Sequence, residues 1–325
     1  MNPPINPTNA EIHVVVGAGT TGSATARRLA ADGTSVRVIS RSGNGPVHPL
    51  IELIAADASD ATVLQHHTAD ASVIYNCANP PYHRWTTDWP PLSSSLLAAA
   101  KASGAVLVTL SNLYGYAPPT APMNATDPLD ATSVKGGVRA AMWHEALAAH
   151  EAGSVRITEA RASDFIGADV GESGHMGDRV VPRLLVGKSV SLLGSLDAPH
   201  SWTAIDDVAR TLITLGHEPQ AWGKAWHVPT AAPMTQREIV QRMCDLAGVD
   251  RVSIKTLPSF ALTLAGFFSP MIRELKEVVY QFEEPFVIDA AATTEAFGLE
   301  PTPIDETLLA SLGSYSPKSQ TIAIS

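Results

Sequence analysis

The chain has 325 residues, a formal net charge of −10 and 45% hydrophobic residues, with a mean hydropathy of +0.07. This composition is typical of a globular protein with a sizeable core. The negative charge argues against nucleic acid and anionic membranes as partners, because the overall field would repel both. We therefore expect a small-molecule substrate as the partner.

Cysteine use and the terminal segment indicate the compartment. The two cysteines, Cys77 and Cys244, lie far apart, so we expect no disulfide framework and a reducing environment. The first ten residues have neither the basic nor the apolar region of a secretion signal. The uncharged stretch at 256–272 contains two prolines and falls short of the ~20 apolar residues of a membrane span; we interpret it as a buried or amphipathic helix beside a substrate site. These features predict a cytoplasmic protein.

The first half of the chain alternates short β-branched runs with alanine-rich stretches. This alternation is typical of repeated βαβ units and a parallel sheet. The predicted helices each end just before a glycine, as helices commonly do. We predict strands at 12–16, 35–39, 51–55, 72–76, 105–110 and 155–160, and helices at 21–31 and 94–102.

The alternation stops after about Phe165, where glycines and shorter helical patterns appear. Residues 200–215 read as a strand followed by a helix, and residues 223–228 read as another strand, and both can return to the first domain. We expect a doubly wound parallel α/β fold, with a larger domain over residues 1–165 and a smaller, interwoven domain over residues 166–325.

A glycine motif directly follows the first predicted strand. Residues 14–22 read V-V-V-G-A-G-T-T-G, which places G-x-G-x-x-G between a strand and a helix. The first glycine permits a tight turn, the second lets the backbone approach a pyrophosphate, and the third lets helix and strand pack closely. The pyrophosphate then lies on the helix N-terminus. The motif predicts a Rossmann-type dinucleotide site formed by Gly17, Gly19, Thr20, Thr21 and Gly22.

The end of the second predicted strand distinguishes two dinucleotides. An acidic residue there binds the ribose 2′-hydroxyl of NAD, whereas an arginine accommodates the 2′-phosphate of NADP. Here the residues are Ser40, Arg41 and Ser42, without an acid. The planar arginine fork and the serine hydroxyls can all bind a phosphate. We therefore predict NADP as the cofactor.

With these motifs in place, the chain resembles the extended short-chain dehydrogenase/reductases, also called the NAD-dependent epimerase/dehydratase family. The resemblance covers nearly the whole chain and is closest to an atypical branch with N-L-Y-x-Y after the fifth strand. Three further segments carry it: R-A-S-D-F-I-G at 161–167 is similar to R-P-x-x-x-Y-G beside the nicotinamide, W-T-A-I-D-D-V-A at 202–209 to V-D-D-V-A, and F-G-L-E-P at 297–301 to the closing G-x-x-P.

The resemblance implies several roles. The first domain would bind NADP and the second the substrate. Asp57 would contact adenine, and Ala78, Asn79 and Ser163 would lie along the cofactor. A homodimer through a two-helix face is also implied.

The catalytic residues depart from the family's pattern. In the family a tyrosine exchanges a proton with the substrate oxygen, a lysine lowers its pKa and holds the nicotinamide ribose, and a serine or threonine assists. At the corresponding positions this chain has Lys135, Arg139 and Asn112. It therefore reads K-x-x-x-R where the family reads Y-x-x-x-K, and it cannot use that machinery unchanged.

Tyr114 is the candidate proton partner. It follows the predicted fifth strand, at the carboxyl edge where ligands bind in open α/β sheets. Beside Lys135 and Arg139 its pKa would be lowered toward the working range. The alternative is that Tyr114 packs in its loop and Lys135 only binds the ribose.

The predicted substrate pocket contains aromatic residues and histidines: Tyr82, His83, Trp85, Tyr116 and His175. A surface histidine is the alternative for His83, and a solvated loop the alternative for His175. The histidines are scattered without H-x-x-x-H or Cys/His ligand spacing, so we predict no metal.

We expect an NADP-dependent oxidoreductase that transfers hydride to or from a small carbonyl, alcohol or conjugated substrate. The alternative, from another class, is a redox-silent NADP-binding sensor or regulatory module. The replaced tyrosine and lysine favour the sensor, and the aromatic, histidine-bearing loop at 82–85 favours the enzyme.

Overall fold

The computed structural model describes residues 11–257, 277 and 279–315. Our interpretation of 256–272 as a helix falls largely outside these residues. Its first two positions belong to a strand, β13 (Ile254–Leu257), and not to a helix.

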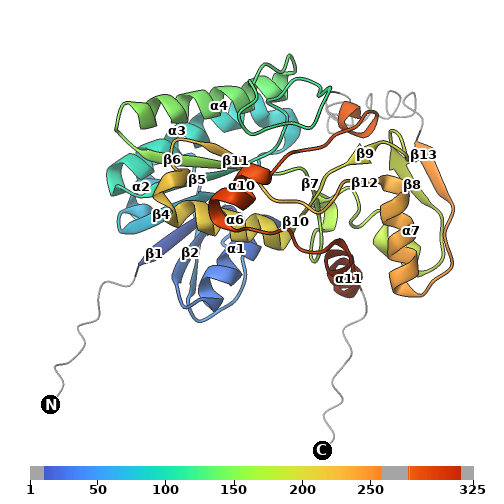
Figure 1. Cartoon of the computed structure of the whole chain (residues 1–325). Helices are drawn as coiled ribbons and strands as arrows, with labels where there is room; N and C mark the ends of the chain where they lie inside the picture. The colour runs from blue at the N-terminus through green and yellow to red at the C-terminus, as the bar shows by residue number, and fades with distance from the viewer. Residues whose placement is uncertain (1–10, 258–276, 278, 316–325) are drawn as a thin grey trace, which may run out of the picture.

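A parallel sheet of seven strands forms the centre of the fold (Figure 1). Its order is β11-β6-β5-β4-β1-β2-β3, and every adjacent pair runs parallel. This confirms the doubly wound α/β fold predicted from the alternation of short strands and helices. The strands are β1 (Ile12–Val16), β2 (Ser35–Ser40), β3 (Ile51–Ala55), β4 (Ala71–Asn76), β5 (Val106–Ser111), β6 (Arg156–Arg161) and β11 (Ala225–His227).

Helices cover both faces of this sheet. The buried side chains of β1 show why: Val15 packs in one core with the helices α1 and α6, whereas Val14 and Val16 pack in the other core with α2, α3 and α4. Strand residues alternate between faces, so a strand that is apolar throughout must be covered on both. These helices are α1 (Thr20–Ala31), α2 (Ala61–Thr68), α3 (Trp85–Ser103), α4 (Val134–Glu151) and α6 (Ile205–His217).

Helix α3 begins nine residues earlier than the predicted start at residue 94. A proline inside a helix removes a backbone hydrogen bond, which makes Pro90 and Pro91 unfavourable in a helix. Both prolines lie inside the helix here. The extra turns bury Trp85 and Trp89 completely in the core, and burial of two indoles offsets the lost hydrogen bonds.

The remaining elements of the described chain are β7 (Asp164–Ile166), α5 (Val181–Leu185), β8 (Val190–Leu193), β9 (Pro199–His200), β10 (Trp202–Ala204), β12 (Met234–Thr235), α7 (Gln236–Ala247), α10 (Ala291–Phe297), α11 (Ile304–Tyr315) and the short helical turns η1 (Tyr82–Arg84), η2 (Gly171–Ser173), η3 (Pro219–Ala221) and η4 (Val279–Phe282).

A third core lies beyond the carboxyl edge of the sheet and is formed by α5, β8, α7, α11 and the short strands near them. Strand β11 returns to the large sheet beside β6, as the pattern at 223–228 predicts. The division into domains near residue 165 stays a prediction.

None of the helices within the described residues is both long and apolar enough to cross a membrane.

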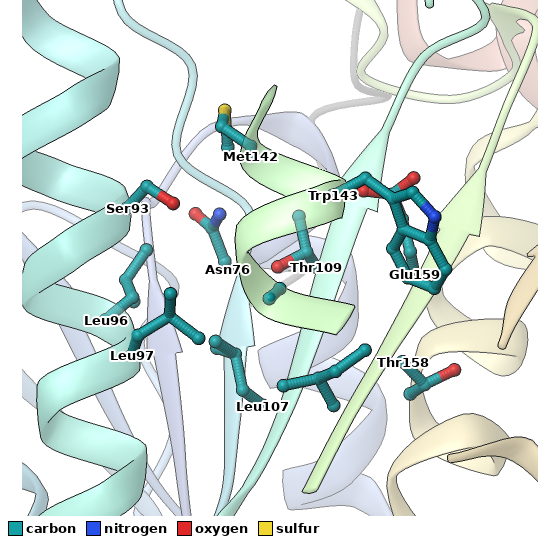
Figure 2. Close-up of a pocket in the computed structure, with 12 residues that line it drawn as sticks. Asn76, Ser93, Leu96, Leu97, Leu107, Thr109, Met142, Trp143, Thr158 and Glu159 are labelled. Carbon is teal, nitrogen blue, oxygen red and sulfur yellow. The ribbon is translucent and has the colours of Figure 1, made fainter. Parts of the chain in front are cut away.

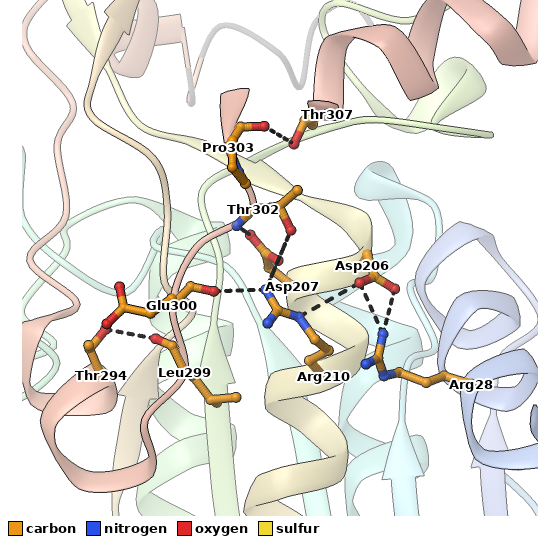
Figure 3. A network of polar contacts seen from close by, with 10 residues as sticks. All are labelled: Arg28, Asp206, Asp207, Arg210, Thr294, Leu299, Glu300, Thr302, Pro303 and Thr307. Carbon is orange, nitrogen blue, oxygen red and sulfur yellow. Dashed lines mark hydrogen bonds and ion pairs between the residues drawn. The ribbon is translucent and has the colours of Figure 1, made fainter. Parts of the chain in front are cut away.

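A buried carboxylate joins α6 to the segment that follows α10 (Figure 3). Asp207 accepts hydrogen bonds from the Thr302 backbone (2.9 Å) and hydroxyl (2.6 Å) and pairs with Arg210. Arg210 in turn donates to the Glu300 carbonyl at 2.8 Å. The neighbouring Asp206 is exposed and pairs with Arg28 of α1. The D-D pair at 206–207 therefore connects three parts of the fold.

Replacing Asp207 by alanine should lower the free energy of unfolding by ~3–5 kcal/mol, because Arg210 and the Thr302 amide lose their buried partner. The matched control, Asp206→Ala, should cost no more than ~1 kcal/mol, as is usual for an exposed ion pair. Urea unfolding of both variants measures the difference. Equal losses would show that the buried carboxylate is not the stabilising member of the pair.

Candidate dinucleotide and catalytic site

The turn after β1 contains three glycines. A side chain would not fit at Gly17 or Gly22, whereas there is open space at Gly19. A Cβ on Gly22 would lie 1.9 Å from the Gly17 carbonyl oxygen. Gly17 has φ +102°, and its Cβ would lie 2.7 Å from the backbone of Cys77. A Cβ on Gly19 would meet nothing within 4 Å. Gly19 is also the N-cap of α1 and offers no side chain to the first amides. The open space and the free amides fit a pyrophosphate.

The two threonines of the motif point in different directions. Thr20 donates its hydroxyl to the Asp169 carbonyl at 3.1 Å, which ties α1 to the loop after β7. Thr21 is buried, and its hydroxyl contacts the Cys77 thiol. The Thr21 side chain packs into the core, so the predicted cofactor contact of Thr21 would have to come from its backbone amide. Burial also raises the pKa of Cys77 to about 12, so the thiol stays protonated.

The loop after β2 presents a free cation. The Ser40 hydroxyl donates to the Asn44 carbonyl (2.9 Å), and Ser42 Oγ accepts from the Asn44 amide (3.3 Å), so both serines serve a tight loop. Arg41 is exposed and makes no hydrogen bond or ion pair with the part of the chain that is described. Exposed Asp57 accepts two hydrogen bonds from Ser59; these, and then the charge of Arg41, lower its pKa.

Three predicted cofactor contacts lie along the same edge of the sheet. Ala78 and Asn79 follow β4, and Ser163 follows β6. Asn79 is exposed and Ala78 half-buried. The Ser163 hydroxyl is buried without a hydrogen-bond partner among the described residues, so it can accept one from a ligand.

Two tyrosines meet at the carboxyl edge of β4 and β5. The hydroxyls of Tyr82 and Tyr114 are 2.8 Å apart, and Tyr114 is only 8% exposed. Burial raises the pKa of Tyr114 well above its usual value of 10, and Tyr82 and Asp164 raise it further. The expected lowering by Lys135 and Arg139 is therefore wrong, because burial outweighs their charges.

Lys135 lies in the first turn of α4, where Ser133 caps the helix by accepting from the Gly136 amide at 3.0 Å. Its ammonium is 2.6 Å from Glu277 Oε2 and 5.7 Å from the centre of the Tyr82 ring. The side chain is almost fully buried. The Lys135 charge is thus paired with Glu277 and lies over the Tyr82 ring.

Arg139 lies one turn further along α4 and turns inward. Its guanidinium packs 4.7 Å from the Trp85 ring and 4.4 Å from the Trp89 ring. Nε and Nη1 are buried and lack a hydrogen-bond partner within the described chain. Burial lowers its pKa to about 10. Arg139 therefore packs against the core indoles of α3.

Three other predicted side chains do not face a ligand. The Asn112 side-chain oxygen accepts from the Tyr114 amide at 3.2 Å, which stabilises a turn. Trp85 is buried and donates to the Pro80 carbonyl at 2.8 Å. Tyr116 is buried and accepts from Arg161 at 2.7 Å. The placement of Trp85 and Tyr116 in a substrate pocket is wrong, because both belong to the interior.

Tyr116 is part of a buried polar chain. His227 Nδ1 lies 2.9 Å from the Asp289 carbonyl and must donate to it, so its Nε2 accepts from the Tyr116 hydroxyl at 2.9 Å. Burial lowers the pKa of His227 to about 4, which keeps the ring neutral. Arg161 also pairs with Glu159 at 2.7 Å. This chain fixes the end of β6 beneath the site.

The two histidines of the predicted pocket differ. His83 is exposed, in agreement with the surface alternative. His175 is half-buried, lies 2.8 Å from Gln236 and packs 4.3 Å from the Phe282 ring. Burial lowers its pKa to about 4. His175 therefore belongs to a packed loop and is neutral at physiological pH.

The sequence reading missed an acid beside the tyrosines. Asp164 begins β7 and lies 2.9 Å from His200 Nε2, while His200 Nδ1 lies 3.1 Å from the Gln281 carbonyl. Both ring nitrogens of His200 therefore lie within hydrogen-bond distance of an oxygen atom. The Gln281 side chain also faces Tyr114 and partly offsets the rise in its pKa. The fourth residue of R-A-S-D-F-I-G was the available signal for Asp164.

A small cavity lies behind the site, between α3, α4 and the strands β4 to β6 (Figure 2). Its volume is about 20 Å³, enough for about one water molecule. The cavity is therefore too small for a substrate. Both polar and apolar side chains line it. The lining includes Asn76, Ser93, Leu96, Thr109, Met142 and Glu159.

The sequence model of the "NAD dependent epimerase/dehydratase family" matches residues 13–228. The chain belongs to this family. No curated protein sequence matches it.

Several solved structures share the fold of this chain. An epimerase from Methanothermobacter thermautotrophicus has 16% identity and a TM-score of 0.79, over 94% of this chain and 92% of that one. UDP-glucose 4-epimerase from Thermotoga maritima with UDP-glucose has 15% identity and a TM-score of 0.77, over 94% and 98%. dTDP-glucose 4,6-dehydratase from Bacillus anthracis with NAD has 18% identity and a TM-score of 0.74, over 95% and 98%. At these identities the likeness concerns the fold.

Gly19→Val should abolish dinucleotide binding without unfolding the protein, because the new side chain enters the open space above the α1 N-terminus. Gly313→Val is the control, since its Cβ also meets nothing within 4 Å but lies on α11. Calorimetric titration with NADPH and thermal melting report binding and folding. Unchanged binding by the Gly19 variant would mean that the motif is only a turn.

Proposed function

We propose that this member of the family is an NADPH-dependent reductase of a small carbonyl or conjugated substrate, with Tyr114 as the proton donor. The observation that carries the proposal is the Tyr82–Tyr114 hydroxyl pair, 2.8 Å apart and buried at the edge of the sheet that also carries the glycine turn. In α/β sheets of this type ligands bind at that edge. A nicotinamide dinucleotide supplies the hydride when bound.

Side chains of this chain suit the three parts of such a cofactor. The space over Gly19 and the free amides of α1 suit the pyrophosphate. Arg41 has no partner of its own among the described residues and suits a 2′-phosphate, which a guanidinium binds in a bidentate manner. The buried, unpartnered Ser163 hydroxyl suits the nicotinamide end. NADP is therefore preferred over NAD.

The raised pKa of Tyr114 favours one direction of reaction. A phenol that keeps its proton at neutral pH donates a hydrogen bond to a carbonyl oxygen and can give it a proton, but it is a poor base for an alcohol. The hydroxyl of Tyr82, which is less buried, lies 2.8 Å from that of Tyr114 and would return a proton to it after the reaction. The Lys135 ammonium, 5.7 Å from the Tyr82 ring, favours the transient negative charge on this pair.

The activity test is NADPH oxidation at 340 nm with purified protein and a panel of aldehydes, ketones and conjugated carbonyls. Sugar nucleotides belong in the panel, since two structures of similar fold are a UDP-glucose epimerase and a dTDP-glucose dehydratase. Turnover above background supports a reductase. Tight NADPH binding with no turnover across the panel would favour the redox-silent sensor, whose supporting observation is the Lys135–Glu277 pair in place of a catalytic tyrosine.

NADPH should bind at least tenfold more tightly than NADH, and Arg41→Ala should remove most of that preference, because a charge-assisted pair contributes ~1.5–3 kcal/mol. Arg251→Ala is the control. Arg251 is also exposed, but it is distant from Arg41 in the sequence and pairs with Asp245. Calorimetric titration with both nucleotides gives the ratio. Equal affinities in the unmodified protein would contradict NADP specificity.

Tyr114→Phe keeps the ring in the core but removes the hydroxyl, so turnover should fall ~10²–10⁴-fold with NADPH affinity nearly unchanged. Tyr315→Phe removes a tyrosine hydroxyl that donates to Asp178 at 2.6 Å and makes no hydrogen bond with the Tyr82–Tyr114 pair within the described residues, and it should leave turnover unchanged. Steady-state kinetics and NADPH titration of both variants provide the measurement. Full activity in the Tyr114 variant would transfer the proton-donor role to another group.

A further inference from the structure

Three potential metal ligands meet at the amino edge of the central sheet, at the other end of β1 from the glycine turn. Glu11 precedes β1, His13 lies near its start, and His217 is the last residue of α6. Ligand atoms of the three side chains lie within 4.8 Å of one another. They are far apart in the sequence, which explains why no ligand spacing is visible there.

His13 carries an unsatisfied nitrogen in the interior. The side chain is 0% exposed; its Nδ1 is 3.1 Å from the Tyr75 hydroxyl, whereas its Nε2 is buried with no hydrogen-bond partner within the described residues. That Nε2 lies 3.9 Å from the Glu11 carboxylate. A buried ring nitrogen without a partner is costly.

His217 is oriented in a similar way. Its Nδ1 lies 2.8 Å from the Ile213 carbonyl and must donate to it, so in the neutral ring Nε2 holds the lone pair. Donation of the second ring proton to a backbone carbonyl is the usual support of a metal-binding histidine. The His13 and His217 ring centres are 5.0 Å apart. Two imidazoles on one tetrahedral ion at 2.0–2.1 Å have centres about 5 Å apart.

We propose that Glu11, His13 and His217 bind one Zn²⁺ ion, with water as the fourth ligand. Two imidazoles and a carboxylate are a zinc-type donor set, and Mg²⁺ or Ca²⁺ would require mainly oxygen ligands. Zinc needs its ligand atoms about 3.4 Å apart. Glu11 and His217 are exposed and can rotate inward, while buried His13 is fixed. The bound ion would tie the end of α6 to the start of β1.

The test uses the untagged full-length chain, freed of metal by chelation and titrated with ZnCl₂ in a calorimeter. We expect one Zn²⁺ per chain. Glu11→Gln and His217→Ala should each weaken binding at least tenfold, and both should fold because their side chains are exposed. His144→Ala, which removes another exposed histidine from α4, should bind as the unmodified chain does. Substitution of buried His13 is avoided because it could prevent folding.

Two further measurements give independent readouts. Zn²⁺ should raise the thermal midpoint of the unmodified chain by several degrees and that of His217→Ala by much less, since an ion that binds the native state stabilises it. Co²⁺ in place of Zn²⁺ should give the visible absorption of a four-coordinate site. No stoichiometric binding, or binding that neither Glu11→Gln nor His217→Ala weakens, would overturn the proposal. Neither result bears on NADPH turnover.

Discussion

The close approach of the β1 turn to the end of β4 is the constraint on which the rest of the site depends. Gly22 must lie against the Gly17 carbonyl, and Gly17 against the backbone of Cys77, at separations that no side chain allows. This contact directs the N-terminus of α1 toward the carboxyl edge of the sheet. It also sets where the chain leaves β4, and the next residues supply Tyr82 and the two indoles of α3. One backbone contact thus positions both the open space over Gly19 and the Tyr82–Tyr114 pair.

Burial distinguishes this site from the pattern that the family resemblance implies. There, cations beside a tyrosine would lower its pKa. Here the two cations of α4 have other partners: Glu277 for Lys135 and the indole faces of Trp85 and Trp89 for Arg139. Tyr114 is shielded from water, and its raised pKa means that it keeps its proton. The outcome is a site whose buried tyrosine is protonated at neutral pH.

Features set by local sequence could be predicted. The strands of the central sheet and the glycine turn follow from apolar runs and from the few conformations that each turn permits. The start of α3 could not be, because it depends on burial of Trp85 and Trp89 against distant strands. The interior position of Tyr116 could not be predicted either, because it depends on Arg161 and on β11. Nor could the proximity of His13 and His217, because the fold alone brings these two residues together.

The central claim is that buried Tyr114 donates the proton during carbonyl reduction. The pH dependence of single-turnover NADPH oxidation, measured with a carbonyl that the protein reduces, tests it most directly. A donor must be protonated to act, and its rate contribution is lost as the pH rises through its pKa. Since burial places that pKa above the usual value of 10, the account predicts a rate that stays level from neutral pH to about pH 10. A rate that falls as the pH rises through 7 to 9 would contradict it.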